Sequence, residues 1–418
     1  MILCSARSNS ARAFFCFATV IFLIALFRMK EISQNVFYCG LHDRDRKLFD
    51  QLVPLPQGTT YNSYLIKGSS KCAVVDTMYA KLAEPYMNMV KSSGFSVDYI
   101  VSNHAEPDHS GCILPLLNLY PEAKVLCSEK CSQNLQNMLG VGIERIRVVS
   151  DGEEVDLGGL TLKFLMTPWV HWPDTMCTYC PEKRMLFSCD LFGAHYTDFE
   201  LFADDSPALA DAAKRYYAEI MMPFAGFCRK YVKMVESLGV DMILPSHGAI
   251  YSNPAFILNL YKAWSSEDLS KKAVIGYVSM YDNTKLMSEY LANALRNRGV
   301  EVLLADLMEI DEGELAMELI DASALIFGTS MVLAGPHPKV VYASYLTGIL
   351  RPKLKFYSVI GSFGWGGNLT AAVEANMGSL KAEKVEGVVT KGRPLQADFN
   401  KLDELADTIA KKLDSVCR

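Results

Sequence analysis

The stretch from Val101 to His109 constrains the fold of this chain more than any other part of its sequence. It reads VSNHAEPDH and follows a short β-rich run, so a single loop carries four side chains that can bind a metal ion: His104, Glu106, Asp108 and His109. Three more such residues each follow another β-rich run: His171, Asp190 and His247. Because each lies just past the end of a strand, we expect all of them to converge on one edge of a sheet.

The chemistry of these side chains limits which metal ions they can bind. Seven nitrogen and oxygen ligands without a thiolate can fill two metal sites, with one carboxylate bridging them. Such a set suits iron, zinc or manganese, whereas sites built from histidine alone favour zinc. Glu106 adds a hard anionic oxygen, which helps to stabilise a ferric ion.

Composition excludes several classes of protein. A chain of 418 residues exceeds the size of one core, so two domains are expected. Half of the residues are hydrophobic and 21% are charged, which excludes wholesale disorder. The net charge of −6 argues against a nucleic-acid partner. Twelve cysteines are too few for a disulfide scaffold and favour reduced thiols in the cytoplasm.

Strands alternate with helices along most of the chain, which predicts an α/β fold. A new pattern begins near Ala273, with a strand over 273–278, a helix over 284–298 and a strand over 300–304. These three elements form a βαβ unit that opens a parallel sheet. We place the connection between the two domains at residues 253–271, where Pro254 and a polar run interrupt the rhythm.

Residues 1–28 differ from the rest, because Ala13 to Phe27 form an apolar run of 15 residues. That run is shorter than the roughly 20 residues of a spanning helix, and no small-residue cleavage site follows it. Three interpretations stay open. The segment is an upstream extension of a chain that starts at Met29, a membrane anchor, or a cleaved signal, and we favour the first.

The motif HAEPDH, followed by His171, Asp190 and His247 at these separations, resembles the flavodiiron branch (A-type flavoproteins) of the metallo-β-lactamase superfamily. The hydrolases of that superfamily usually have histidine where this chain has Glu106. The stretches 58–66 (GTTYNSYLI), 171–176 (HWPDTM) and 245–248 (PSHG) add to the likeness, which runs from about Lys30 to the C-terminus. The resemblance implies a metallo-β-lactamase-like αββα sandwich over 29–252 and a flavodoxin-like, doubly wound parallel sheet over 272–418.

By the same resemblance, His104, Glu106 and His171 would hold one iron. Asp108, His109 and His247 would hold the other, with Asp190 bridging. His109 is the least secure ligand, since some relatives leave the corresponding histidine unligated. His195 is interpreted as a structural residue or one that supports a ligand, and a role for His42 in the substrate pocket is an open alternative to a structural one.

Three loops after strands of the second domain predict a flavin site. Hydroxyl and backbone N–H groups at a helix N-terminus suit a phosphate, and no P-loop lysine or glycine-rich fingerprint is present. This arrangement resembles the binding of FMN by flavodoxin, a fold for which FMN at the switch point of the sheet is a standard example. The predicted FMN contacts are Ser279, Met280, Tyr281, Asp282, Asn283, Thr284, Thr329, Ser330, Met331, Ser362, Phe363, Gly364, Trp365 and Gly366. Trp365 would stack on the flavin or lie at its edge, and plain packing is the alternative.

The pair Cys177 and Cys180 forms a lone CxxC motif. Alternation along a strand would point the two sulfurs to opposite faces, so we interpret the pair as structural.

Together these parts imply a cytoplasmic oxidoreductase that reduces O2 to water, and NO to N2O as a second activity. FMN and two iron ions would store the electrons, and a separate donor such as rubredoxin or a reductase would supply them. The family also implies a head-to-tail homodimer, or a dimer of dimers, that sets the FMN of one subunit beside the irons of the other. Two alternatives remain: a binuclear metal hydrolase with a fused flavodoxin domain, and an electron carrier with a degenerate metal domain.

Overall fold

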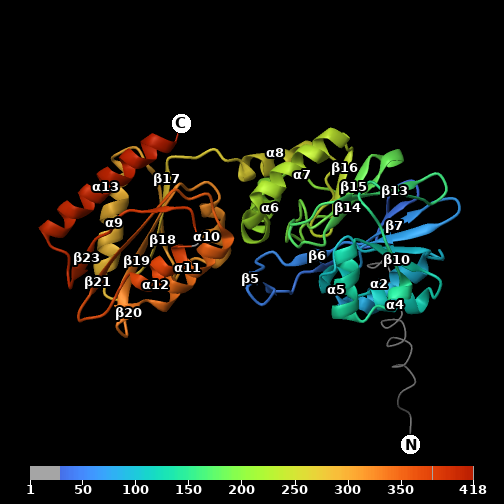
Figure 1. Cartoon of the computed structure of the whole chain (residues 1–418), viewed down its shortest axis with the longest axis horizontal. Coiled ribbons are helices and arrows are strands. Elements are labelled where there is room, and N and C mark those ends of the chain that lie inside the picture. Colours follow the sequence, from blue (N-terminus) through green and yellow to red (C-terminus); the bar gives the residue numbers. More distant parts are fainter. Residues whose placement is uncertain (1–28, 379, 418) are drawn as a thin grey trace, which may run out of the picture. The chain divides into compact units, whose positions relative to one another are not determined.

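The computed structural model describes residues 29–378 and 380–417, so the three interpretations of residues 1–28 fall outside it. The chain forms two compact units (Figure 1). The first contains residues up to Arg46, Gln57–Asp204 and Val235–Pro254. The second contains Lys47–Pro56, Asp205–Met234 and Ala255–Arg418. Among the described helices, none combines the length and apolar character needed to cross a bilayer.

Two sheets build the first unit. The spatial order of the first sheet is β1 (Lys30–Ser33), β2 (Val36–Tyr38), β7 (Tyr64–Lys67), β8 (Cys72–Val75), β9 (Tyr99–Val101), β10 (Lys124–Cys127) and β11 (Ile146–Val148). The order of the second is β12 (Glu154–Asp156), β13 (Thr161–Met166), β14 (Met176–Cys180), β15 (Met185–Cys189) and β16 (Met242–Pro245).

Alternating side chains give the first sheet two apolar faces. One face packs against the second sheet, with Tyr64 and Val101 among residues such as Phe164 and Phe187. The other face packs under the helices α2 (Ala83–Ser92), α4 (Ile113–Leu119) and α5 (Glu129–Leu139). This layered α/β arrangement leaves the loops at the carboxyl ends of the strands free to carry a site.

A mostly parallel sheet forms the centre of the second unit. Its order is β18 (Glu301–Asp306), β17 (Lys272–Val278), β19 (Ala324–Val332) and β21 (Phe356–Phe363), and β21 also pairs with β22 (Glu383–Lys384) and β23 (Val389–Lys391). The predicted strand–helix–strand unit is therefore present, with α9 (Asn283–Arg296) between β17 and β18.

Helices cover both faces of this sheet (Figure 1). On one face lie α9 and α13 (Gln396–Val416). On the other lie α10 (Glu312–Leu319), α11 (Pro338–Leu350) and α12 (Ala371–Met377). The strand order reverses between β17 and β19, so the chain leaves these two neighbours towards opposite faces and opens a crevice at their carboxyl ends. This is the doubly wound sheet that the sequence predicted.

The predicted connection over 253–271 contains α8 (Pro254–Ser265), and the predicted domain boundaries stay a prediction. The CxxC pair lies on β14, where both cysteines are buried and unlinked. Burial raises the pKa of Cys177 to about 12 and that of Cys180 to about 11, as in unreactive structural thiols. All ten described cysteines are free thiols, and only Cys417 is partly exposed.

Candidate metal and flavin sites

The structure gathers the seven predicted metal ligands in the first unit, in two neighbouring groups. The first group is His104, Glu106, His171 and Asp190, and the second is Asp108, His109 and His247. Within each group the ligand atoms lie within 4.8 Å of one another. Loops past the ends of β9, β13, β15 and β16 supply them, as the sequence predicted for side chains that follow strands.

Asp190 faces both groups with different oxygens. Its Oδ2 lies 3.8 Å from Nε2 of His104 and 3.7 Å from Nε2 of His171. Its Oδ1 lies 2.9 Å from Nε2 of His109 and 3.6 Å from Nε2 of His247. A carboxylate in this position can share one oxygen with each of two cations.

The other carboxylates each serve one group. Oε2 of Glu106 lies 3.2 Å from Nε2 of both His104 and His171. Asp108 places Oδ2 3.2 Å from Nε2 of His247 and Oδ1 3.4 Å from Nε2 of His109. Each group therefore offers two imidazole nitrogens and a carboxylate of its own.

Local hydrogen bonds fix the loop that carries four of these residues. Buried Asp76 accepts the backbone N–H and the side-chain amide of Asn103, at 2.8 and 2.9 Å. Pro107 then starts the short helix α3 (Pro107–Ser110), and the hydroxyl of Ser110 donates to the carbonyl of Ala105 at 2.7 Å. Proline suits this position because the first N–H of a helix has no partner within the helix.

A second layer of contacts orients the histidines. Nδ1 of His104 lies 3.2 Å from Oδ1 of Asp174, and Nδ1 of His247 lies 2.6 Å from the carbonyl oxygen of Thr60. An acceptor at Nδ1 keeps the proton on that nitrogen, so the lone pair of the neutral ring is on Nε2, which faces the site. The ring of His195 lies 5.1 Å from that of His247, and its Nδ1 lies 2.8 Å from Oγ1 of Thr59.

The protonation of the site follows from these contacts. Burial alone would raise the pKa of Glu106, but hydrogen bonds to His104 and His171 outweigh burial and lower it to about 2. Burial likewise opposes the charged forms of Asp190 and His109. Attraction by Asp108 and by Asp190 nevertheless raises the pKa of His109 to about 10, and attraction by His109 lowers the pKa of Asp190. Glu106 and Asp190 are therefore ionised, and a metal ion must displace protons from His104 and His109 to bind, because the pKa values of both histidines are raised.

The donor atoms fit a pair of metal ions. Both carboxylate oxygens of Asp108 and the Nε2 atom of His109 are buried, and in the described part of the chain they have only the ionic contacts given above and no hydrogen bond of good geometry. Buried polar atoms are rarely left in this state unless an ion or a water molecule completes them. The structure brings all seven residues together in two groups, and their role as metal ligands stays a prediction.

The predicted flavin loops meet at the carboxyl edge of the sheet in the second unit. Residues 279–282 join β17 to α9. Residues 329–331 lie in the last part of β19, and residues 362–366 contain the end of β21 and the start of the loop after it. The hydroxyls of Thr284 and Ser362 lie 3.2 Å apart, which joins the first loop to the third. Gly328 is required on β19, because a Cβ atom there would lie 2.7 Å from Oγ of Ser288.

These loops also fit their predicted ligand. The hydroxyl oxygens of Ser279 and Ser330 are buried without a hydrogen-bond partner among the described residues. Unpaired hydroxyls beside the start of α9 are suitable donors to a phosphate. Tyr281 and Trp365 are 82% and 64% exposed, which leaves two aromatic rings available to a flat ring system. Contact of each predicted residue with FMN stays a prediction.

Two residues that orient the ligand histidines, Asp174 and Thr60, were not assigned this role from the sequence. Asp174 and Thr60 both fall in stretches that carried the family resemblance, yet their contacts with His104 and His247 depend on folding. Asp174 lies only three residues after the predicted ligand His171, and this closeness in sequence could have indicated a carboxylate that supports a ligand. His42 lies 3.1 Å from the carbonyl of Thr197 and packs on Phe199, so its described contacts are structural.

Comparison with known proteins agrees with this geometry. Residues 59–248 match the ODP family beta lactamase. The nitric oxide reductase of Moorella thermoacetica is 33% identical over 396 residues, which cover 91% of this chain and 98% of that protein. The type A flavoprotein of Rhodobacter capsulatus is 32% identical and 88% of each chain is covered. The rubredoxin oxygen:oxidoreductase of Desulfovibrio gigas superposes with a TM-score of 0.87 at 29% identity, covering 93% of this chain and 99% of that one.

This chain belongs to the flavodiiron protein family. As a flavodiiron protein it is an oxidoreductase with a lactamase-like and a flavodoxin-like fold, and family membership implies a flavin and iron. The relatives are named for redox reactions, and Glu106 departs from the usual hydrolase motif, so the hydrolase alternative is not favoured.

Proposed function

We propose that this flavodiiron protein reduces O2 to water, with NO as a second substrate, using electrons that pass from an external donor through FMN to a pair of iron ions. The observation that carries the proposal is the position of Asp190, whose two oxygens face two separate sets of histidines and carboxylates. A single-ion site has no need of such a bridging carboxylate.

Under this proposal the residues of the metal site have two roles, binding iron and orienting the residues that bind it. His104, Glu106 and His171 would hold one iron, while Asp108, His109 and His247 would hold the other. Bound FMN and iron would supply the electrons, four for each O2 reduced to two waters and two for each pair of NO molecules reduced to N2O. Asp174 and the carbonyl of Thr60 keep two ligand histidines in the required tautomer.

The flavin loops would hold FMN through the hydroxyls of Ser279, Thr284 and Ser330, with neutral donors in place of basic side chains. The donor would be a small redox protein such as rubredoxin, a proposal supported by the name of the relative from D. gigas. A head-to-tail homodimer would bring the flavin of one subunit beside the irons of its partner.

Cofactor content tests the proposal first. Elemental analysis and absorbance of the purified chain should give about two irons and one flavin per chain, and chromatography of the released flavin should identify FMN. Two zinc ions per chain would favour a hydrolase instead, and flavin without metal would indicate an electron carrier. Anaerobically reduced protein should then consume a pulse of O2 faster than an equal pulse of NO, and the reverse order would reassign the main substrate.

A further inference from the structure

A second, unassigned binding site is indicated by the charge of the segment between α11 and β21. Residues 351–355 read RPKLK, which places Arg351, Lys353 and Lys355 on a stretch of five residues. Acidic residues outnumber basic ones in the whole chain, 47 to 41. Such a local concentration of cations therefore departs from the general charge of the protein.

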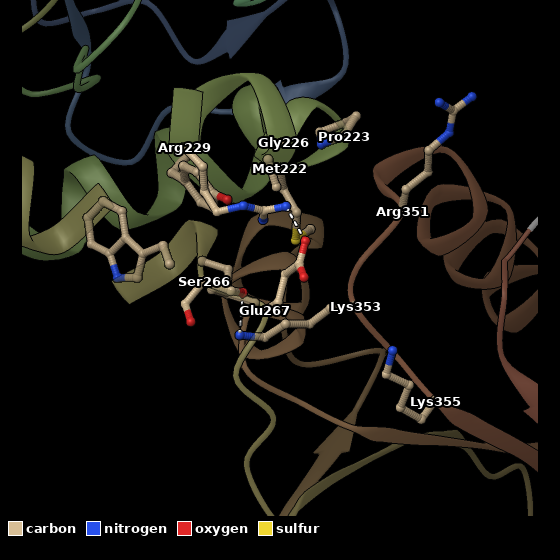
Figure 2. A pocket seen from close by; sticks show the side chains of 13 residues that line it. Met222, Pro223, Gly226, Arg229, Ser266, Glu267, Arg351, Lys353 and Lys355 are labelled. Carbon is tan, nitrogen blue, oxygen red and sulfur yellow. Dashed lines mark hydrogen bonds and ion pairs between the residues drawn. The ribbon is translucent and has the colours of Figure 1, made fainter. Parts of the chain in front are cut away.

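These cations line a cavity within the second unit. The cavity has a volume of about 480 Å³ and also contains Arg229, Trp264 and Glu267 in its walls. Figure 2 shows Arg229 reaching in from α7 (Ala225–Leu238) on one wall, with Arg351, Lys353 and Lys355 on the segment that forms the other. The size suits a small molecule.

A second hollow of about 590 Å³ shares Arg351, Lys353 and Lys355 and adds Lys381. The two hollows border the same segment 351–355, and we call them together the basic groove. Its cations are Arg229, Arg351, Lys353, Lys355 and Lys381, and Glu267 is the acidic residue in its walls. Asp268 and Asp321 also lie close enough to attract Lys353, so five cations face three carboxylates in or near the groove, and the surplus of positive charge attracts anions.

Most of the cations of the basic groove are not neutralised by ion pairs within the protein. Among the described residues, Arg351, Lys355 and Lys381 form no ion pair. Lys353 donates to the carbonyl of Ser266 at 3.2 Å, which leaves two further donors on its ammonium group. Burial lowers the pKa of Lys353 despite attraction by Asp321 and Asp268, so a bound anion would favour its charged form.

Arg229 is held by an ion pair that a ligand could replace. Its guanidinium contacts Glu267 and also donates to the carbonyl of Ser265. The Glu267 side chain is 81% exposed, and an exposed ion pair contributes little to stability. An anion with several charges can therefore displace Glu267 and take over the guanidinium, for which a phosphate is a good geometric match.

The groove is separate from the proposed redox route. It lies before the amino end of β21, whereas the predicted flavin loop lies at the carboxyl end of that strand. A strand of eight residues spans roughly 25 Å. The proposed electron transfer therefore does not pass through the groove, and an anion bound there would not contact the flavin.

We propose that the basic groove binds a small molecule that carries two or more phosphate groups. A single phosphate would satisfy only one or two of the five cations, whereas a polyphosphate can contact both walls at once. Trp264, which is only partly buried in the wall of the cavity, offers aromatic surface on which a nucleotide base could pack.

Calorimetric titration of the holoprotein tests this proposal. Tripolyphosphate and ATP serve as probes at constant ionic strength, and each should bind saturably with one site per chain. Equal affinity would show that only phosphates are recognised, and tighter binding of ATP with quenched tryptophan fluorescence would show that the base packs as well. ATP binding without any binding of tripolyphosphate would contradict recognition by the cations.

Charge variants decide whether the groove is the site. The exposed pair R351Q/K355Q should weaken binding of tripolyphosphate at least about tenfold. The control pair K91Q/K401Q removes the same charge from exposed positions on α2 and α13 and should leave the affinity unchanged. E267Q should strengthen binding severalfold, because it frees Arg229 and removes a repulsive charge. Absence of saturable binding, or an equal loss in the control pair, would overturn the proposal.

Discussion

The carboxylate of Asp174 lies behind His104, with one oxygen 3.2 Å from Nδ1 of the ring and the other accepting the N–H of Ala105 at 3.0 Å. In the variant D174N the amide must turn its NH2 group towards one of these two donors, so one hydrogen bond is lost. We expect metal affinity to fall about 10- to 100-fold, as is usual when the support of a ligand histidine is removed.

Competition with a chelator would measure the metal affinity of D174N, with iron content as a second readout. The matched control is D156N, which makes the same change at the exposed end of β12, where Asp156 accepts the N–H groups of Gly158 and Gly159. Equal weakening in both variants would contradict a specific role for Asp174.

Residue chemistry explains which parts of the site could be foreseen. Histidine, glutamate and aspartate after strand ends are unusual enough to identify His104, Glu106 and Asp190 before folding is known. The support from Asp174 and from the carbonyl of Thr60 could not be foreseen, because aspartates are common in loops and every residue has a carbonyl. Only the fold brings these acceptors to the right nitrogen.

At the scale of elements, the π-helical turn Tyr217–Met221 carries a buried carboxyl group, Glu219. Burial is the largest influence on its pKa and raises it to about 8, because Arg215 is shared with Asp311, to which it donates at 2.9 and 3.0 Å. The folded protein therefore keeps a proton on Glu219 at a pH where the unfolded chain has lost it.

The pH dependence of stability follows from this difference. The carboxyl is neutral in both states below its ordinary pKa of 4.5, so no penalty arises there. As pH rises towards 8, the unfolded state gains by ionising and the free energy of unfolding falls, by at most about 1.4 kcal/mol per pH unit. Urea unfolding from pH 5.5 to 8 should show this slope in the wild type and a smaller slope in E219Q. Identical slopes would contradict the raised pKa.

Close packing of strands gives a second prediction for an element. A Cβ atom on Gly361 of β21 would lie 2.1 Å from the carbonyl oxygen of Thr329 on β19 and 2.6 Å from Cδ2 of Leu369. We therefore expect G361A to lower the free energy of unfolding by about 1–3 kcal/mol. Gly364 has no heavy atom within 4 Å of the same position, so thermal unfolding of G364A should match the wild type.

At the scale of the whole molecule, the proposed homodimer makes Trp365 a link between subunits. Its side chain is 64% exposed on the predicted flavin loop. W365A should slow electron transfer from flavin to iron in stopped-flow measurements and leave the iron content unchanged, because no predicted metal ligand is near it in sequence or in its unit. Loss of iron from W365A would contradict this assignment.

The sequence predicts the secondary-structure layers of the molecule better than it predicts which segments belong to which unit. Period-two and helical patterns indicate strands and helices, and the order of β17, α9 and β18 follows from them. The pattern of α6 (Pro207–Tyr216) shows an apolar face but not which unit covers it. The structure assigns α6 to the second unit, although it precedes β16 of the first in the chain.

The burial of the cysteines has a practical consequence for studying this protein. Nine of the ten described thiols are inside the fold, and burial raises the pKa of residues such as Cys72 and Cys228 to about 12. A thiol reagent can modify these side chains only when the surrounding structure opens. Because buried thiols lie in both units, the alkylation rate of each cysteine would report how often the structure around it opens.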